Sequence, residues 1–154
     1  MSAVTGDIRE LVYGLRPPAL DDLGLARAVR DLAGQSSPDT AIDVEVEGDL
    51  TDLPAAVEVA VYRIVQEALT NIRRHAEASR ARIVLRREEP VLRVLISDDG
   101  KGLPASHRAG VGLGSMRERA AELGGICVVT GEPGAGTRVE VMLPLLTAGV
   151  SLRS

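Results

Sequence analysis

Several residue types are scarce in this sequence. Phenylalanine and tryptophan are absent from the 154 residues and tyrosine occurs twice, so the hydrophobic core must be built from Val, Leu, Ile and Ala. A single cysteine, Cys127, excludes an internal disulfide, and a total of two histidines argues against a zinc site. We expect Cys127 to serve as a small packing residue within a strand.

Long hydrophobic runs and strong net charge are lacking as well. No apolar run approaches the roughly 20 residues that span a bilayer, and no signal-peptide pattern is visible. The net charge of −4 argues against nucleic-acid binding, while 45% hydrophobic and 26% charged residues are typical of a globular protein. We therefore expect one cytoplasmic domain without membrane contact.

The pattern divides the chain into three parts. Residues 1–36 read as an appendage of two short helices, which Pro17 and Pro18 separate and of which the second could be capped by Asp21 and Asp22. Residues 37–145 form the main domain and begin with a half-exposed strand at 42–46. The sequence shows no pattern from Leu145 on, and we expect the tail 146–154, beyond the main domain, to be frayed.

The stretch Leu53–Ala76 is predicted to form a long helix with two rows of side chains. An apolar row should face the core, and residues on the opposite side should be solvated. A polar row follows the same spacing beside the apolar one, and it is either the ordinary flank of an amphipathic helix or a set of functional groups. The apolar row is Val57, Val61, Ile64, Ala68 and Ile72; the polar row is Glu67, Asn71, Arg74 and His75; the solvated side is Gln66, Thr70, Arg73 and Glu77.

Two strands, 81–88 and 91–98, should follow and turn at Glu89-Pro90. Asp98 continues the parity of the apolar positions in the second strand, so its carboxylate should point inward, where an unpaired charge is costly. It is either a capping residue in an Asx-turn or an acceptor reserved for a ligand.

Ten of the sixteen glycines lie between Gly100 and Gly136. One group directly follows Asp98, and another precedes a helix expected at about 115–123, where free backbone N–H groups could bind an anion. The second group is not a dinucleotide fingerprint, because no preceding strand or βαβ unit surrounds it, and a Walker P-loop is absent. The segment 103–109 between the groups could act as a lid, in which His107 reads as an exposed loop residue.

Two closing strands are expected at 126–130 and 137–143. Thr137 shares the parity of the apolar positions of the second of these strands, so its hydroxyl should also face inward.

Four segments, in order, resemble a known superfamily. Q-E-A-L-T-N-I-R-R-H-A (66–76), D-D-G-K-G (98–102) and G-V-G-L-G-S-M-R-E-R-A (110–120) resemble the N, G1 and G2 boxes of the GHKL ATPases, and G-A-G-T-R-V-E-V-M-L-P (134–144) resembles their closing strand. In addition, L-R-P-P-A-L-D-D-L-G-L (15–25) resembles the exit from the second dimerisation helix of sensor histidine kinases of the NarL-partner type.

This resemblance implies an α/β fold, a two-layer Bergerat (GHKL) sandwich with helices packed on one face of a mixed sheet, that binds ATP and Mg²⁺. It implies that Glu67 is the catalytic carboxylate and that Asn71 is the Mg²⁺ ligand, consistent with the oxygen ligands that Mg²⁺ prefers. Asp98 would accept from the adenine amino group, with Thr137 beside it, and at least one of Arg74 and His75 would approach the phosphates. The remaining nucleotide-binding positions implied are Gly100, Gly102, Gly110, Gly112, Leu113 and Gly114.

The acceptor histidine of such kinases precedes everything present in this sequence, and neither His75 nor His107 matches it. The resemblance thus implies a catalytic module, monomeric or weakly dimeric, that phosphorylates a separate dimerisation domain and acts indirectly on a response regulator. The whole could be the cytoplasmic portion of a membrane-anchored sensor. An anti-sigma-type serine kinase or switch protein, or a nucleotide-binding module without transfer activity, remain alternatives.

Overall fold

The computed structural model describes residues 16–35, 40–101, 111–131 and 135–145, and within them the side chains of all but 75–76 and 111–113. Three α-helices, a π-helical turn and five strands alternate along this part of the chain, and none of these helices is long and apolar enough to cross a membrane. In order, the elements are α2 (Pro18–Gly34), β1 (Ala41–Glu47), α3 (Ala55–Asn71), η1 (Ile72–Ala76), β2 (Arg80–Glu88), β3 (Val91–Asp98), α4 (Val111–Glu122), β4 (Ile126–Gly131) and β5 (Thr137–Pro144).

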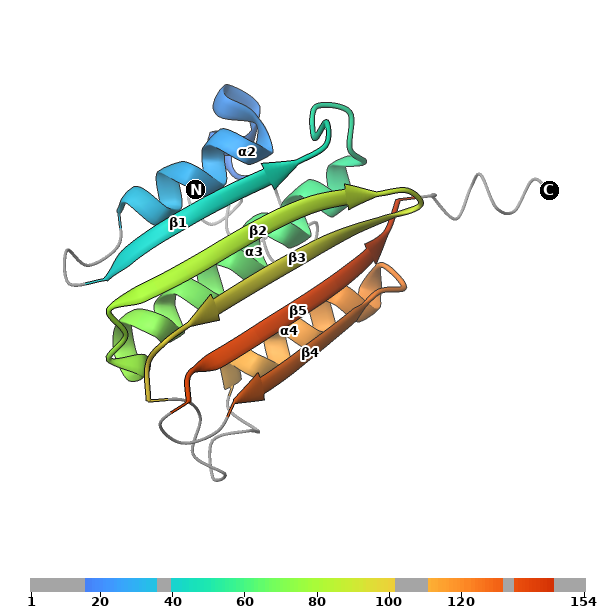
Figure 1. Ribbon diagram of the computed structural model, residues 1–154. Helices are drawn as coiled ribbons and strands as arrows, with labels where there is room; N and C mark the ends of the chain where they lie inside the picture. Colours follow the sequence, from blue (N-terminus) through green and yellow to red (C-terminus); the bar gives the residue numbers. More distant parts are fainter. Residues whose placement is uncertain (1–15, 36–39, 102–110, 132–134, 146–154) are drawn as a thin grey trace, which may run out of the picture.

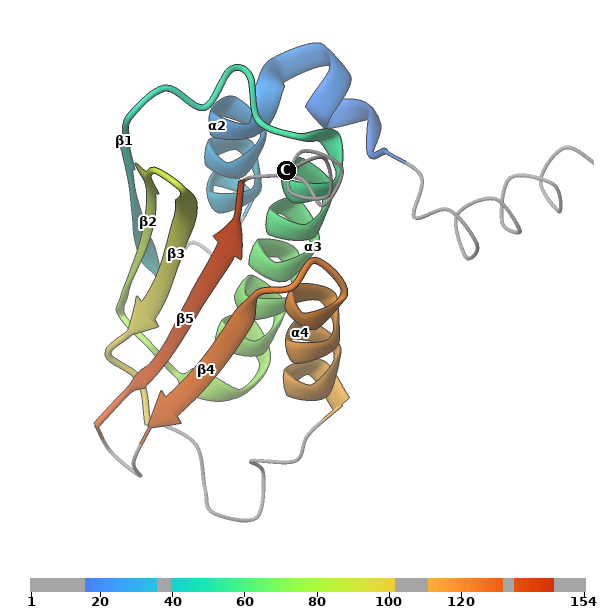
Figure 2. The same cartoon turned by 90° about the vertical axis from the view of Figure 1, so that its right-hand side faces the viewer.

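The strands form one mixed sheet in the order β1-β2-β3-β5-β4 (Figure 1). β1 runs parallel to β2, and every other neighbouring pair is antiparallel. The helices pack on one face of this sheet and leave the other face open (Figure 2). This arrangement confirms the two-layer sandwich expected from the sequence.

Helix α3 lies in the middle of the helical layer, where it contacts α2 on one side and α4 on the other. The predicted apolar row of α3 is buried throughout, with exposed fractions of 5% or less. It packs against the inward positions of the strands, which alternate with exposed ones as a half-buried sheet requires. The row is Val57, Val61, Ile64, Ala68 and Ile72.

Of two sequence expectations about residues at the edge of the core, one is confirmed and one is wrong. Cys127 is buried in β4, which confirms its role as a packing residue. Leu145, by contrast, was expected to start a patternless tail, but it is buried and its N–H donates to the carbonyl of Pro90 at 2.8 Å. The residues after it lie outside the described part of the chain.

Helix α2 shares the core of the domain rather than packing separately. Five of its side chains are buried, and the helix contacts both α3 and β1. Gly24, with φ +80°, interrupts the helix, a conformation that glycine adopts without steric cost. Asp21 does not cap the helix as expected; its Oδ1 accepts from Arg16 Nε at 2.5 Å. The interpretation of 1–36 as the end of a dimerisation helix stays a prediction.

An ion pair of Arg16 also connects the start of α2 with the start of α3. Its Nη1 lies 2.7 Å from Oε1 of Glu58, whose side chain is only 9% exposed. Glu58 lies in the first turn of α3, where the helix dipole favours a negative charge. A buried carboxylate requires such a partner, because an unpaired charge in the core is strongly destabilising.

Arg16→Met should therefore lower the free energy of unfolding by about 2 kcal/mol, less than for a fully buried pair because the arginine is partly exposed. Denaturant unfolding measures this loss. Combining the change with Glu58→Met should recover much of it, whereas Asp21→Asn, at an exposed partner, should cost under about 0.5 kcal/mol. Equal effects of Arg16→Met and Asp21→Asn would show that Glu58 does not depend on Arg16.

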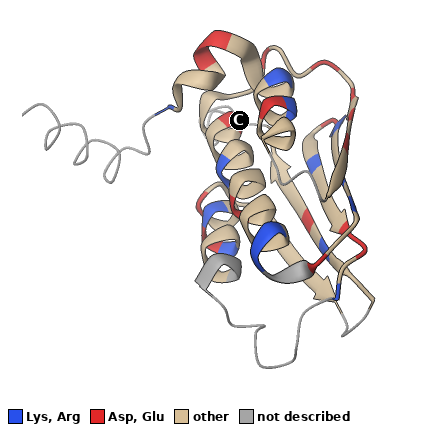
Figure 3. Ribbon diagram, turned by 90° about the vertical axis from the view of Figure 1, so that its left-hand side faces the viewer, with Lys and Arg blue, Asp and Glu red and all other residues tan. Residues whose placement is uncertain are grey.

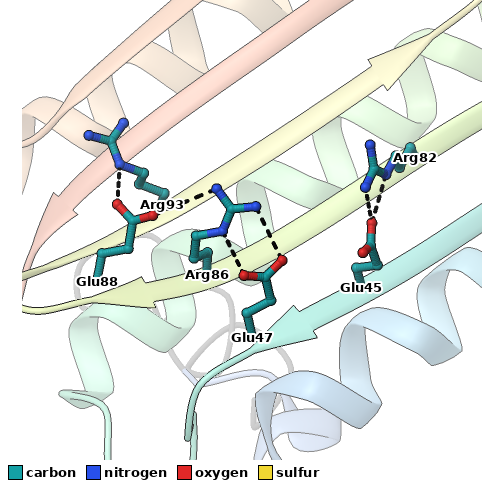
Figure 4. A network of polar contacts seen from close by, with 6 residues as sticks. All are labelled: Glu45, Glu47, Arg82, Arg86, Glu88 and Arg93. Atoms are coloured by element: carbon teal, nitrogen blue, oxygen red, sulfur yellow. Dashed lines mark hydrogen bonds and ion pairs between the residues drawn. The ribbon is translucent and has the colours of Figure 1, made fainter.

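The open face of the sheet carries arginines paired with glutamates on neighbouring strands (Figure 4). Arg82 pairs with Glu45 and Arg86 with Glu47 across β1 and β2, while Arg93 of β3 reaches Glu88 at 2.7 Å. Positive and negative residues are interspersed over the described helices and strands (Figure 3). The pairs cover the outer side of the sheet and keep it polar around Val84, which is buried there.

Candidate functional site

The predicted site residues that the structure describes gather at one end of the sandwich. Here η1 ends, β3 ends at Asp98, β5 begins at Thr137, and α4 begins (Figures 1 and 2). Antiparallel pairing places Asp98 directly opposite Thr137. Residues far apart in the sequence therefore form one surface at the end of the helical layer.

The predicted polar row of α3 keeps its position beside the core as far as Asn71 but not beyond it. Glu67 and Asn71 are half-buried beside the core row, as expected, but Arg74 is exposed. The difference arises because the helix changes to a π-helical turn at Ile72, and wider i→i+5 turns do not keep the α-helical spacing. π-Turns within helices are frequent at functional sites. The side chain of His75 lies outside the described ones.

The other side of α3 is less solvated than its sequence indicates. Gln66 and Thr70 are half-buried, because the C-terminal half of α2 lies beside them, and only Arg73 and Glu77 are exposed. Glu67 therefore borders two surfaces, the core row on one side and a groove toward α2 on the other.

Asp98 is half-buried at the end of β3. Its Oδ1 accepts from the N–H of Gly100 at 2.7 Å, so the Asx-turn exists. Burial nevertheless raises the pKa of this carboxyl, against the opposing effect of backbone N–H donors from Gly100 and Thr137. Its hydrogen bonds thus do not offset the loss of solvent, and a further donor would favour the charged form. The two interpretations of Asp98 are compatible.

Asp99 has a different task, which the sequence did not reveal. Its carboxylate accepts from the N–H and hydroxyl of Ser79 and from the N–H of Arg80 at 2.8–3.0 Å. These donors lower its pKa. Asp99 therefore ties the start of β2 to the end of β3, whereas its neighbour Asp98 points to the other side of the sheet, as the period of two requires. In the sequence, the signal for these two different roles was the pair of consecutive aspartates at positions 98 and 99.

A close approach of two backbones shapes the surface around Asp98. Gly136 has φ +84°, and a Cβ at this position would lie 2.2 Å from the carbonyl oxygen of Asp98. Thr137 follows directly and is half-buried with the inward parity expected of it. Only glycine fits at 136, so the loop before β5 can hold Thr137 against Asp98.

Gly136→Ala should lower the free energy of unfolding by at least about 2 kcal/mol, because alanine disfavours this φ and its methyl would displace the strand end. Thermal or denaturant unfolding measures the loss. Gly34→Ala is the matched control, since no atom lies within 4 Å of a Cβ there. Similar stabilities of the two variants would contradict the close approach.

Helix α4 begins earlier than predicted, at Val111 instead of about Ser115. Gly112, Leu113 and Gly114 accordingly lie in its first turn rather than in a preceding loop. The helix still starts at the same end of the molecule as Asp98, with its free N–H groups there. Gly102, Gly110, His107 and the expected lid lie outside the described residues.

Asn71 and Asp98 contribute side-chain oxygen atoms at this end of the sandwich. Among the described residues no group of three or more His, Cys, Asp or Glu side chains could hold a metal ion. Asn71 offers a single carboxamide oxygen, which suits an ion that takes its other ligands from water and phosphate. Asp98 offers a half-buried carboxylate acceptor at the end of β3.

Sequence comparison shows which family the chain matches. Residues 56–147, from α3 to the end of β5, match the family described as histidine kinase-, DNA gyrase B-, and HSP90-like ATPase. The chain is 36% identical over 141 residues to the sensor histidine kinase LiaS of Bacillus subtilis, covering 90% of this chain and 39% of LiaS. It is 40% identical over 141 residues to the histidine-protein kinase/phosphatase UhpB of Salmonella typhimurium, covering 89% of this chain and 28% of UhpB. The chain thus spans less than half the length of these relatives.

Solved structures show the same likeness. The histidine kinase domain of the blue-light activated histidine kinase from Erythrobacter litoralis EL346 matches with a TM-score of 0.57 and 31% identity, covering 78% of this chain and 61% of that chain. A longer structure of that kinase gives a TM-score of 0.62 and 30% identity, covering 79% of this chain and 41% of that chain. With its three helices over a five-stranded mixed sheet, and with the sequence match across α3 to β5, the chain belongs to the histidine kinase-, DNA gyrase B- and HSP90-like (GHKL) ATPase family.

Proposed function

We propose that this chain is the catalytic ATP-binding module of a sensor histidine kinase. It binds ATP with Mg²⁺ and transfers the γ-phosphoryl group to a histidine on a dimerisation domain outside the chain. The observation that supports this proposal is that half-buried Glu67 and Asn71 in the last turns of α3 and half-buried Asp98 at the end of β3 lie at the same end of the sandwich. The sensor histidine kinases among its relatives favour this activity over that of a serine kinase.

Each residue has a distinct task in this proposal. Asp98 accepts a hydrogen bond from the adenine amino group, with Thr137 beside it. Asn71 ligates Mg²⁺, which when bound neutralises charge on the phosphates. The N–H groups at the start of α4 and at least one of Arg74 and His75 bind the phosphates, as do the glycines named for the two boxes.

Glu67 holds the acceptor imidazole and takes its proton. The imidazole nitrogen attacks the γ-phosphorus in line, the bond to the bridging oxygen breaks, and ADP leaves with that electron pair. The imidazole N–H proton passes to the Glu67 carboxylate. Positioning provides much of the rate, because the nitrogen must lie about 3–3.5 Å from the phosphorus.

We further propose that the chain acts in the cytoplasm, where ATP is available, and belongs to the NarL-partner group of these kinases. Residues 15–25 support that grouping through the L-R-P-P-A-L-D-D-L-G-L signature. A response regulator would then receive the phosphoryl group from the dimerisation domain. The isolated chain would be a monomer or a weak dimer.

Titration calorimetry tests the binding half of this proposal. ATP with Mg²⁺ should bind with measurable heat and raise the melting temperature, since a ligand of the folded state stabilises it. GTP serves as the control, because its base presents an acceptor where adenine presents the amino donor. Absence of heat with ATP and Mg²⁺, in a sample that circular dichroism shows to be folded, would remove the proposal.

A further inference from the structure

Two neighbouring segments of the chain leave the end of the sandwich where Asp98 lies. One segment leads from Asn71 through η1 to the start of β2 at Arg80. The other continues β3 beyond Asp98. The first segment follows the proposed metal ligand, and the second follows the proposed adenine acceptor. A nucleotide that contacts both of these residues needs the two segments at a defined distance from each other.

Strand pairing does not fix this distance completely. The pairing of β2 with β3 ends where Ala81 lies opposite Asp98. The chain that approaches Ala81 reverses direction at Glu77, which has φ +51°. Beyond the last pair, one backbone hydrogen bond joins the two segments in the described part of the chain, from the N–H of Asp99 to the carbonyl of Arg80 at 3.1 Å.

The carboxylate of Asp99 supplies the rest of the connection. Its Oδ1 accepts from the N–H groups of Ser79 and Arg80 at 2.9 and 3.0 Å, and its Oδ2 accepts from the hydroxyl of Ser79 at 2.8 Å. Hydrogen bonds to an ionised acceptor are about twice as strong as neutral ones. The side chain is exposed, so these bonds rather than burial hold it in place. Asp99 therefore connects the segment after Asn71 with the segment after Asp98.

Asp98 itself has other supports. Its Oδ1 accepts from the N–H of Gly100 at 2.7 Å, and its backbone pairs with Thr137 of β5. Loss of the Asp99 carboxylate would leave both of these contacts intact. What it would release is the segment that follows Asn71, and with it the distance between the metal ligand and the adenine acceptor.

We propose that Asp99 is a positioning residue for nucleotide binding, which holds Asn71 and Asp98 at the spacing that a single nucleotide requires. Two contacts made by one ligand strengthen each other only when their spacing matches that ligand. Asp99 touches neither the base nor the metal ion, because its carboxylate is directed away from Asp98 toward the start of β2. This inference rests on the proposed binding of ATP with Mg²⁺.

Comparison of two ligands tests the proposal. ATP with Mg²⁺ should engage both sides of the site, whereas adenosine, which lacks phosphates, should contact only the side of Asp98. Asp99→Ala should raise the Kd for ATP with Mg²⁺ about 10-fold or more, because the two contacts no longer match one ligand. The Kd for adenosine should change by less than about threefold, since the supports of Asp98 remain. Calorimetry measures the first constant, and an NMR titration measures the second.

The conservative variant Asp99→Asn should retain most of the affinity. Its side-chain oxygen can accept from the same two N–H groups, and its amide can donate to the Ser79 hydroxyl. The Kd for ATP with Mg²⁺ should therefore stay within about threefold of that of the unmodified chain. Ser79→Ala removes one of the three donors and should weaken ATP with Mg²⁺ in the same direction but by less, which tests the proposal even if Asp99→Ala does not fold.

Asp49→Ala is the matched control. Asp49 also accepts from the N–H and the hydroxyl of one residue, Thr51, at 2.9 and 2.6 Å. It lies between β1 and α3, at the opposite end of the sandwich from Asp98. This variant loses the same kind of hydrogen bonds and should leave both dissociation constants unchanged.

Three results would overturn the inference. Equal losses of ATP and adenosine affinity in Asp99→Ala would mean that Asp99 supports Asp98 or the fold as a whole. Unchanged affinity for ATP with Mg²⁺ in both Asp99→Ala and Ser79→Ala would mean that the connection does not matter for binding. A loss in Asp99→Asn as large as in Asp99→Ala would assign the effect to charge. Failure of the proposed function looks different, because the unmodified chain would then not bind ATP with Mg²⁺.

Discussion

Glu67→Gln should slow phosphoryl transfer to an acceptor histidine by about 10²–10⁴-fold, the usual contribution of a general base, while nucleotide affinity changes little. Glutamine keeps the size of the side chain and can still accept a hydrogen bond, but it cannot take the imidazole proton. Single-turnover transfer to a dimerisation domain measures the chemical step directly. Calorimetry with ATP and Mg²⁺ on the same variant separates the effect from a loss of binding.

Glu122→Gln provides the control for this experiment, because Glu122 is exposed at the end of α4, away from the site end. It should transfer at the rate of the unmodified chain. If Glu67→Gln did the same, the half-buried carboxylate would be the polar flank of an amphipathic helix, the simpler of the two interpretations that the sequence allowed.

Asp98→Asn should weaken ATP and ADP alike by about 1–3 kcal/mol, or roughly 5–150-fold, because it replaces an acceptor oxygen with an amide donor that faces the adenine amino group. Equal loss for both nucleotides identifies the adenine as the contact, since the two share it. Asn71→Ala provides the contrast, because it should weaken mainly the Mg²⁺-dependent part of the affinity. Unchanged affinity of Asp98→Asn for both nucleotides would mean that the adenine lies elsewhere.

The pH dependence of Asp98 gives a second measure of the same contact. Burial raises the pKa of Asp98 in the folded chain, so ionising this carboxyl destabilises the fold. The protonated carboxyl therefore contributes fully to stability below the unfolded pKa of about 3.9. This contribution is lost as pH rises through the folded pKa. A bound adenine amino group favours the charged form and should lower this pKa. Nucleotide affinity should then increase as pH rises toward the folded pKa of the free chain, because the carboxyl ionises over this range. A carboxyl-carbon NMR titration of Asp98 with and without ADP, showing no downward shift, would contradict the contact.

Periodicity predicted most of the fold. Val57, Val61 and Ile64 recur at helical spacing and are buried in α3, and alternation along 91–98 placed Asp98 on the inner face of β3. These signals are local, because each depends only on which residues of one element meet the same surface. The same parity correctly oriented Thr137 in β5.

Features that depend on contacts between distant segments were not predictable in this way. The ion pair between Arg16 and Glu58 joins two helices, and nothing near either residue indicates its partner. Helix α2 was expected to lie in an appendage. The apolar row of a helix shows that one face is buried, but it does not show against which other elements that face packs. The π-turn at Ile72 depends on hydrogen-bond geometry, so nothing in the residue pattern separates Arg74 from Asn71.

Asp98, the last residue of β3, and Asp99, which follows it, show what the sequence alone does not reveal at the site. Parity separates Asp98 from Asp99, but the donors of Asp99 come from Ser79 and Arg80 at the start of another strand. Only strand pairing brings them together. The resemblance to GHKL ATPases supplied roles for Glu67 and Asn71 that their positions support, and the variants above test those roles.

Phosphoryl transfer to a separate protein can be measured by incubating this chain with γ-³²P-ATP, Mg²⁺ and a separate dimerisation domain and then treating the label with acid and with base. We expect an acid-labile, base-stable label on the dimerisation domain, dependent on Glu67, and very little label on this chain. Label that remains on this chain and disappears in His75→Gln or His107→Gln would place the acceptor histidine in this chain and contradict transfer to a separate domain.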